Sequence, residues 1–369
     1  MALLQGVFAQ IMLFVGFLYL RNKSELNEPL NSNRICSTPF FECTYLRFRT
    51  VLILAIGLVV IGCSEKKEPE FLLQASHLVS ENHTWYQAFE YFAQILEERS
   101  DGRIVVRNYH SEQLAKEIEA IRLIQAGVID MTTTGSMLNN WIDIVAFCEL
   151  PFLLRDSTDM KNLIEGPIGR RMENEMRDKT GIRPIGYFQR GPRHLTSNRP
   201  LSHPDDLKGL IVRVPNVPSF VTAWEALGAK PTPMAFSEVF TSLQQGAIEA
   251  QENPFAMIKA SGFYEVQEYI NLTGHVISWT YPVIGEKQFQ AFPEDLKEIF
   301  LEAAEDMQAY EHQLFINNEK RVQDELKAAG MKFVDVDQKA YGDKCREAIY
   351  QSLSPEMQLV YNEIIASRK

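Results

Sequence analysis

Apolar residues along the chain recur with two alternating periods, which predict strands and helices in turn. The run FLLQAS, residues 71–76, predicts a strand. Residues 83–100 place Trp85, Phe89 and Phe92 at helical spacing, so these side chains are expected to face a core. The same cycle continues with a strand over 102–109, a helix over 112–127 that ends at a glycine, and a strand over 128–135. This alternation predicts a largely parallel sheet covered by helices.

A second cycle of strands and helices begins near Gly186. Its predicted strands are 194–200, 210–214 and 248–254, and its predicted helices are 216–227 and 235–246. A helical pattern then runs from Pro293 to about Ala329, which is longer than most helices of globular proteins. The chain therefore contains two α/β units and a helix that is long enough to brace both.

Two hydrophobic segments precede the folded part. Residues 2–20 carry no charge and have about the length that spans a bilayer, so they predict a membrane anchor. Arg47 and Arg49 precede the apolar run 51–62, which is too short to span a bilayer and is typical of a secretory signal. This run ends in VIGC, which resembles a bacterial lipobox with Cys63 as the lipidated first residue. The alternative is an ordinary secretion signal in which Cys63 is an incidental apolar residue.

The two segments in tandem suggest that translation starts near Leu46 or Val51. Residues 1–45 would then be an artefact of a longer reading frame; otherwise, the protein has an additional anchor. The remaining boundaries are a signal peptide over 46–63 and a charged linker over 64–70.

Composition places the chain among globular proteins of about two domains, with 46% hydrophobic and 23% charged residues in 369. The net charge of −11 argues against a nucleic-acid-binding protein, because such proteins usually present a basic surface to phosphates. After residue 63 only Cys148 and Cys345 remain, and their separation matches neither a disulfide framework nor a zinc site. We expect buried free thiols, although an exported protein could join the two.

One arginine stands inside a run that otherwise predicts a buried strand. Alternation along residues 210–214 puts Val212 and Val214 on one face, and Ile211 and Arg213 on the other. Burying an unpaired guanidinium is costly, so a partner is required. A carboxylate from a ligand fits this position, because a planar guanidinium binds it through two parallel hydrogen bonds. The alternative partner is an internal glutamate.

The sequence lacks the common catalytic and cofactor-binding motifs. It contains no GxSxG, no HExxH and no glycine-rich phosphate loop. Glu249 and Glu252 lie on one strand with opposite orientations, which makes them a poor acid–base pair. We therefore expect no enzyme activity, no cofactor and no metal.

Two stretches carry a specific resemblance, TSNRPLSHPDDLKGLIVRVPNVPSF (196–220) and ALGAKPTPMAFSEVFTSLQQGAIEAQENP (226–254). They resemble the extracytoplasmic solute-binding proteins of tripartite ATP-independent periplasmic (TRAP) transporters, the DctP-type family, and the similarity extends over about residues 71–350. The resemblance implies a periplasmic protein that closes on an organic acid and delivers it to membrane permease subunits.

The resemblance also implies a fold. It is an α/β periplasmic binding protein of two lobes, two α/β domains with a ligand cleft between them and a long bracing helix. The expected bounds are 71–190 plus 278–318 for lobe 1, 191–277 plus 319–350 for lobe 2, and 351–369 for a C-terminal helix.

The second lobe supplies most of the binding residues that the resemblance implies. The arginine that clamps the ligand carboxylate corresponds to Arg213, a second arginine to Arg193, and an amide to Asn253. Phe236 corresponds to a ring that lies over the ligand, and Trp279 to a cleft-lining residue. The alternatives are a surface charge for Arg193, a helix cap for Asn253 and a core position for Phe236.

Candidates in the first lobe follow the carboxyl ends of its strands, where parallel-sheet proteins bind ligands. They are His77, Glu81 and Asn82 after the first strand, and Thr134 and Ser136 after the third. The spacing of His77 and His83 does not match a metal site.

The hydroxyl-binding side chains among these candidates make a uronate or a related sugar acid the first choice of ligand. A C4-dicarboxylate or a keto acid is the competing choice. A ligand-sensing protein without a transport role is a further alternative.

Overall fold

The computed structural model describes residues 68–368. Cys63 and the two hydrophobic segments lie outside the described residues. Their roles as lipid anchor, signal peptide and membrane anchor therefore stay predictions. Among the helices described, none is both long and apolar enough to cross a bilayer.

The first lobe confirms the strands and helices predicted from its sequence. It is built from β1 (Phe71–Ser76), α3 (Thr84–Arg99), β2 (Ile104–Tyr109), α4 (Glu117–Ala126) and β3 (Met131–Thr134). Helix α4 begins at Glu117 and not near residue 112, because Ser111 and Glu112 have positive φ angles of 52° and 57° that a right-handed helix cannot accommodate. This late start decides which side chains α4 brings to the site.

The second lobe contains its predicted strands and helices, one of them shortened, and adds a strand and a helix that are not among the predicted elements. It contains β6 (Ile211–Val214), α7 (Pro218–Ala226), β7 (Lys230–Pro233), α8 (Val239–Gln244), β8 (Ala250–Asn253) and α9 (Phe255–Ala260). The strand β7 and the helix α9 are the two additions. Helix α8 is shorter than predicted because residues 236–238 form a separate 3₁₀ turn.

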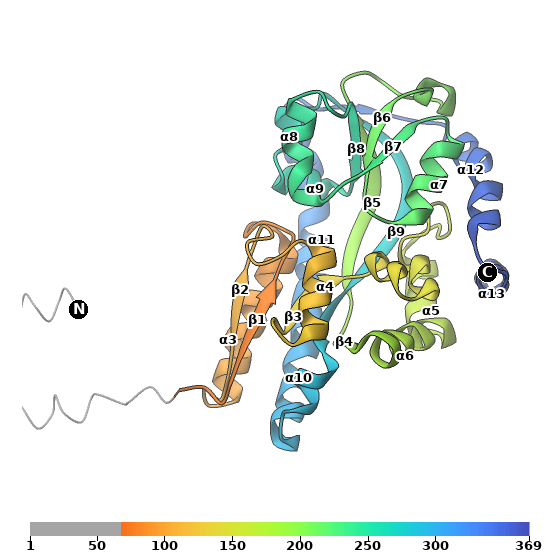
Figure 1. Ribbon diagram of the computed structural model, residues 1–369. Coiled ribbons are helices and arrows are strands. Elements are labelled where there is room, and N and C mark those ends of the chain that lie inside the picture. The colour runs from red at the N-terminus through yellow and green to blue at the C-terminus, as the bar shows by residue number, and fades with distance from the viewer. Residues whose placement is uncertain (1–67, 369) are drawn as a thin grey trace, which may run out of the picture. The chain divides into compact units, whose positions relative to one another are not determined.

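Two long strands connect the lobes, β5 (Phe188–Ser197) and β9 (Tyr269–Gly285). The described strands form a sheet with the order β2-β1-β3-β9-β5-β8-β6-β7 (Figure 1). β9 pairs with β3 near Tyr281 in the first lobe and with β5 at Tyr269 near the second, both in antiparallel fashion. The prediction of a largely parallel sheet holds for β1 with β2 and β3 and for β6 with β7 and β8, but not for the crossing strands. The sheet is mixed, because β5 and β9 run antiparallel to each other, β9 runs antiparallel to β3, and β5 runs antiparallel to β8.

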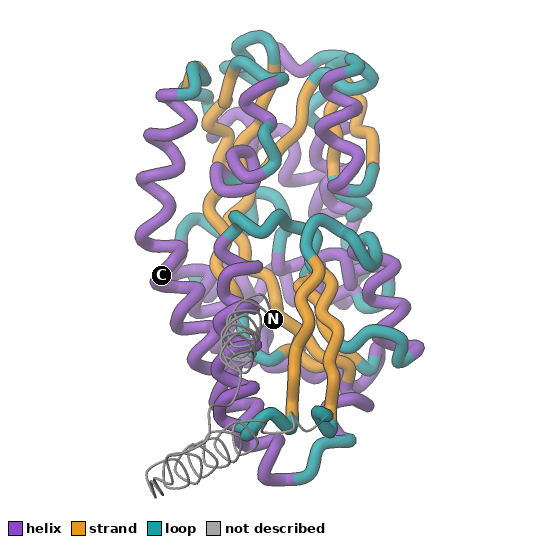
Figure 2. The backbone as a smooth tube through the Cα atoms, turned by 90° about the vertical axis from the view of Figure 1, so that its left-hand side faces the viewer, coloured by secondary structure: helices purple, strands orange, loops and turns teal. Residues whose placement is uncertain are grey.

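The remaining helices lie around the strands, as Figure 2 shows. They are α5 (Ser157–Glu165), α6 (Pro167–Thr180), α10 (Glu286–Gln290), α12 (Gln338–Ser352) and α13 (Pro355–Ser367). The remaining strands, β4 (Ile182–Pro184) and β10 (Lys332–Val334), both pair with β9. Two 3₁₀ helices follow β3, η1 (Ser136–Asn140) and η2 (Asp143–Cys148).

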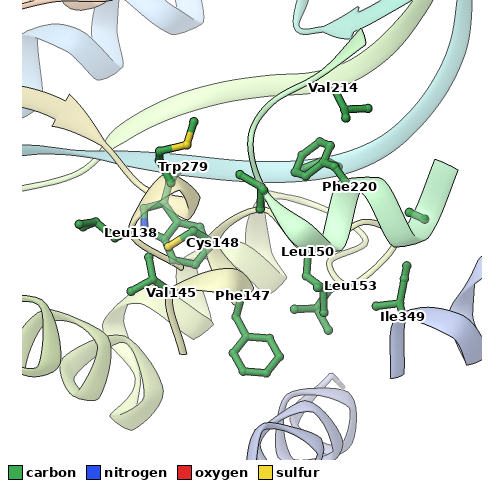
Figure 3. Packing of buried hydrophobic residues seen from close by; sticks show 14 of the residues in the cluster. Leu138, Val145, Phe147, Cys148, Leu150, Leu153, Val214, Phe220, Trp279 and Ile349 are labelled. Carbon is green, nitrogen blue, oxygen red and sulfur yellow. The ribbon is translucent and has the colours of Figure 1, made fainter. Parts of the chain in front are cut away.

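A large apolar cluster surrounds η1 and η2 and extends to β6, α7 and β9 (Figure 3). Trp279 belongs to this cluster and is fully buried, so its predicted position on the cleft is corrected to a position in the core. Cys148 lies in the same cluster, and both it and Cys345 are buried free thiols, as predicted.

The predicted long helix is α11 (Glu294–Ala328), with 35 residues. It packs against α3 of the first lobe, α9 of the second lobe and the crossing strand β5. Polar side chains of α11 hold the backbone of β5 where that strand begins. Gln308 Oε1 accepts from the Tyr187 N–H at 2.7 Å, and Glu311 Oε2 accepts from the Gln189 N–H at 3.0 Å.

Glu311 is fully buried in this contact. Burial raises its pKa to about 8, and the Gln189 N–H, which donates to this carboxyl, and the nearby Thr84 hydroxyl oppose this rise only in part. No cation forms an ion pair with Glu311 in residues 68–368. The side chain therefore acts as a neutral acid at neutral pH.

The substitution Glu311→Gln should make thermal stability less dependent on pH. Between the ordinary pKa of 4.5 and about 8, folded Glu311 keeps a proton that the unfolded chain releases, so stability falls as the pH rises. Glutamine does not titrate. Between about pH 5 and pH 8, the melting temperature of the variant should therefore fall by several degrees less than that of the unchanged protein. Thermal melting followed by circular dichroism measures this. The exposed Glu302→Gln on the same helix is the matched control, and equal pH slopes in all three proteins would refute the assignment.

Candidate functional site

A cavity of about 380 Å³ lies where the two lobes face each other, and both contribute to its lining. Arg190 and Arg193 come from β5, and Arg213 comes from β6. Glu117 begins α4, and Glu149 directly follows η2. Charged side chains from four separate parts of the chain thus converge on one space.

Most second-lobe candidates meet at this cavity. Arg193, Arg213, Asn253 and Phe236 all line it, and Ser136 lines it from the first lobe. Asn253 does not cap α9, because that helix has no side-chain cap; its amide Nδ2 donates to Gln251 Oε1 at 2.6 Å.

The loop after β1 does not contribute its predicted residues. His77 is buried, with its ring 3.0 Å from Asn108 Oδ1, while Glu81 is exposed and Asn82 lines a different cavity. The backbone explains this correction: the loop is held against the loop after β2, since the Glu112 N–H donates to the His77 carbonyl at 2.8 Å. Thr134 does not line the cavity either, but its hydroxyl donates to Glu117 Oε1 at 2.8 Å.

Sequence patterns missed several contributors, among them Trp85, Glu117, Glu149 and Arg190. Arg190 and Arg193 are three residues apart, which in a regular strand places them on opposite faces. The pairing of β5 with β9 shifts register between these two residues, and this irregularity allows both to reach Glu149 Oε1. Gly191 and Pro192 between them are the one local signal of a disturbed strand.

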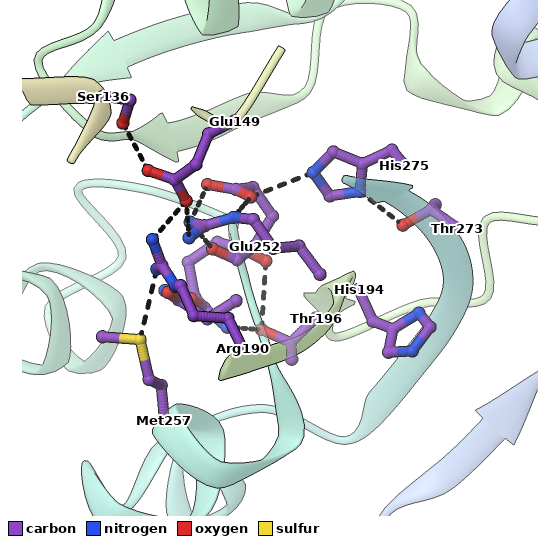
Figure 4. A network of polar contacts seen from close by, with 12 residues as sticks. Ser136, Glu149, Arg190, His194, Thr196, Glu252, Met257, Thr273 and His275 are labelled. Carbon is purple, nitrogen blue, oxygen red and sulfur yellow. Dashed lines mark hydrogen bonds and ion pairs between the residues drawn. The ribbon is translucent and has the colours of Figure 1, made fainter. Parts of the chain in front are cut away.

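Glu149 and Glu252 belong to one buried polar network (Figure 4), and Arg193 pairs with both carboxylates. Its Nε and Nη2 donate to both oxygens of Glu252 at 2.5 and 2.7 Å, and its Nη1 donates to Glu149 at 3.3 Å. His275 Nε2 lies 2.9 Å from Glu252 Oε2. Burial alone would raise the pKa of Glu252, but Arg193 and His275 outweigh it and lower the pKa to about 2. Arg193 is therefore no surface charge, and its charge is balanced inside the protein.

Arg190 is balanced in a similar way. Its Nη1 donates to Glu149 Oε1, and its guanidinium carbon lies 5.3 Å from the centroid of the Trp85 ring. Burial lowers the pKa of Arg190, which Glu149 partly offsets. Glu149 in turn accepts from the Ser136 hydroxyl. Glu149 is thus a shared anchor for two arginines and one first-lobe hydroxyl.

Arg213 differs from the other two arginines. It is 4% exposed, and its Nε and Nη2 donate only to the carbonyl of Met234, at 3.2 and 2.8 Å. No carboxylate within residues 68–368 forms an ion pair with it, so the alternative of an internal glutamate partner does not apply. Burial lowers its pKa to about 10. The guanidinium lies 5.8 Å from the Phe236 ring centroid and lines the cavity without an anionic partner.

Glu117 is the counterpart from the first lobe. One of its oxygens accepts from Thr134, and no cation of the described chain forms an ion pair with it. Burial raises its pKa to about 7, although the Thr134 hydrogen bond lowers it. The cavity therefore has an unpaired cation on one wall and an unpaired carboxyl on another.

Comparison with known proteins shows what the chain is similar to. Residues 75–359 match the family model DctP, described as bacterial extracellular solute-binding protein, family 7. A solute-binding protein of Roseobacter denitrificans is 41% identical over 316 residues, which are 84% of this chain and 97% of that protein.

Two solved structures have the same fold. A TRAP periplasmic solute-binding protein from Roseobacter denitrificans with bound L-galactonate has a TM-score of 0.79 and 41% identity, covering 81% of this chain and 100% of that chain. A TRAP periplasmic solute-binding protein from Haemophilus influenzae with bound L-gulonate has a TM-score of 0.74 and 31% identity, covering 80% and 98% of the respective chains.

Proposed function

Because the chain belongs to the DctP family, the solute-binding proteins of TRAP transporters, we propose that it binds the carboxylate of a sugar acid at Arg213. The observation that carries this proposal is a buried guanidinium that lines a cavity and has no carboxylate partner in the described chain. A ligand carboxylate removes the cost of that unpaired charge and accepts two parallel hydrogen bonds. Asn253 and Phe236, which line the same cavity, are proposed to contact the ligand beside it.

The placement of charges around the cavity favours a ligand with one carboxylate. Arg190 and Arg193 are matched by Glu149 and Glu252, so Arg213 is the arginine of the three without an ion-pair partner in the described chain. Glu112, Glu117 and Glu119 also line the cavity and disfavour a second carboxylate. Two further cations lie at the mouth. Lys116 pairs there with Glu238, and Arg122 is exposed, so water screens its charge.

The opposite wall selects for hydroxyl groups. The carboxylate of Glu117 can accept hydrogen bonds from a sugar hydroxyl, whereas a second carboxylate at that place would be repelled. A C4-dicarboxylate or a keto acid has fewer hydroxyl groups to offer and is the second choice. L-Galactonate and L-gulonate, which occupy the two similar structures, are hydroxylated monocarboxylates.

Besides the Arg193–Glu149 pair, three further contacts join the lobes across or beside the cavity, and binding would stabilise the closed arrangement in which they form. Lys116 pairs with Glu238, Asn140 Nδ2 donates to the Asn216 carbonyl at 3.4 Å, and the Ser80 hydroxyl donates to the Ala260 carbonyl at 3.4 Å. A ligand held by Arg213 and Glu117 at its two ends stabilises the arrangement in which the lobes meet.

The closed protein would then deliver the acid to TRAP membrane permease subunits from the periplasm, with Cys63 as the proposed lipid anchor. Binding alone would also suit a ligand sensor. Uptake of the acid by membrane vesicles that contain the permease, with and without this protein, distinguishes the two roles.

The substitution Arg213→Ala should weaken binding of L-galactonate by at least about 2 kcal/mol, about 30-fold, because the ligand carboxylate is desolvated without its partner. Arg213→Lys should recover only part of this loss, since an ammonium cannot form the two parallel bonds. Isothermal titration calorimetry measures both. Arg199→Ala, at an exposed arginine, is the control. A folded Arg213→Ala protein with unchanged affinity would disprove the assignment.

The substitution Glu117→Gln should reduce discrimination between L-galactonate and succinate. At about pH 8 most of the Glu117 carboxyl is ionised, because its pKa is about 7. The amide accepts a sugar hydroxyl less strongly and no longer repels a second carboxylate, so the affinity ratio should fall about tenfold. Exposed Glu98→Gln, on helix α3 of the same lobe and outside the cavity lining, is the matched control. The same ratio in both variants would contradict a selective role for Glu117.

A further inference from the structure

The backbone of β5 lacks a strand partner on one edge at Gln189. β8 pairs with β5 only from His194 to Ser197, and Gln189 faces Trp279 of β9 on its other edge. A buried N–H or C=O group without a partner is costly, so the free edge must be satisfied in another way. Two side chains do this: Glu311 Oε2 accepts from the Gln189 N–H at 3.0 Å, and Trp85 Nε1 donates to the Gln189 carbonyl at 3.3 Å.

These two backbone groups of Gln189 are close to the ligand cavity in the chain and through their partners. Arg190 is the next residue along the strand, and both Arg190 and Trp85 line the cavity. Their side chains also contact each other, with the guanidinium over the indole ring, and Arg190 donates to Glu149. Displacement of the Gln189 backbone would therefore move two residues of the cavity lining together.

Glu311 itself does not line the cavity, and its position is unfavourable for stability. Its side chain is fully buried, and its Oε1 is without a hydrogen-bond partner of normal geometry. The raised pKa agrees with a carboxyl that gains little from its surroundings. An apolar side chain of similar size would remove this cost, although it would leave the Gln189 N–H without an acceptor.

We propose that Glu311 is a positioning residue of the binding site: by holding the Gln189 N–H from the long helix α11, it fixes Arg190 and Trp85 where the ligand needs them. The proposal rests on the proposed function in one respect, that the cavity beside Arg213 is where the acid binds. The proposal goes beyond that function by assigning a role to Glu311, which does not line the cavity and would not touch the ligand.

Two substitutions separate positioning from stability. Glu311→Gln keeps an oxygen acceptor for the Gln189 N–H and should bind L-galactonate within about twofold of the unchanged protein. Glu311→Leu removes the acceptor and should bind about tenfold more weakly. The melting temperature of Glu311→Leu without ligand should fall less than this loss of affinity would suggest, because the variant also loses the cost of a buried carboxyl. Calorimetry and thermal melting measure the two quantities, and Glu311→Met replaces the leucine variant if that protein does not fold.

Phe300→Leu is the matched control for general destabilisation. Phe300 is a fully buried residue of the same helix that does not line the cavity, so this change should lower the melting temperature and leave affinity unchanged. Wild-type affinity in Glu311→Leu would overturn the proposal. If Phe300→Leu lost as much affinity as Glu311→Leu, the loss would reflect general destabilisation, and the proposal would be overturned too.

A measurement on the ligand-free protein tests the positioning role without depending on which acid the protein binds. The indole N–H of Trp85, assigned in an NMR spectrum by its loss in Trp85→Phe, reports the bond to the Gln189 carbonyl. Its resonance should shift in Glu311→Leu and stay in place in Glu311→Gln. If no acid binds to the unchanged protein, the proposed function fails, while an unmoved indole resonance in Glu311→Leu would refute the positioning role separately.

Discussion

Burial of three arginines against two glutamates is the constraint on which the site depends. Glu252 holds Arg193 through both oxygens, and Glu149 holds Arg190 and Arg193 together. Each of these charges would be costly alone, so the network is stable only as a unit. The cluster keeps one positive charge in excess, and geometry assigns it to Arg213. A ligand carboxylate beside Arg213 balances the charge of this cluster, which explains how an acidic protein with a net charge of −11 can bind an acid.

The crossing strands make this network possible. β5 carries Arg190 and Arg193 between the lobes, and a shift of register beside β9 directs both toward Glu149. The helix α11 supports the same strand from behind through Glu311 and contacts elements of both lobes. The site therefore belongs to neither lobe alone. It forms where the connecting strand is irregular and where side chains replace missing strand partners.

The pattern of apolar and polar residues predicts the segments that have a regular helical or strand period. Alternation along β6 placed Arg213 opposite Val212 and Val214, and the structure confirms that both valines are in the core while Arg213 lines the cavity. The irregular parts escaped prediction for identifiable reasons. A two-residue period cannot place Arg190 beside Arg193, and helical spacing suggested only a core role for Trp85, which packs in the core and also lines the cavity. Glu117 reaches the site because positive φ angles delay the start of α4, which composition does not reveal.

The most direct test of this account is a crystal structure of residues 64–369 with L-galactonate bound. The account predicts that the ligand carboxylate lies about 3 Å from two nitrogens of Arg213, with hydroxyl groups toward Glu117. The Arg193–Glu252 pair should remain intact in that structure, because each of its charges balances the other and the ligand carboxylate is held by Arg213. A ligand whose carboxylate lies at the mouth beside Arg122, with Arg213 still bonded only to the Met234 carbonyl, would contradict the central claim.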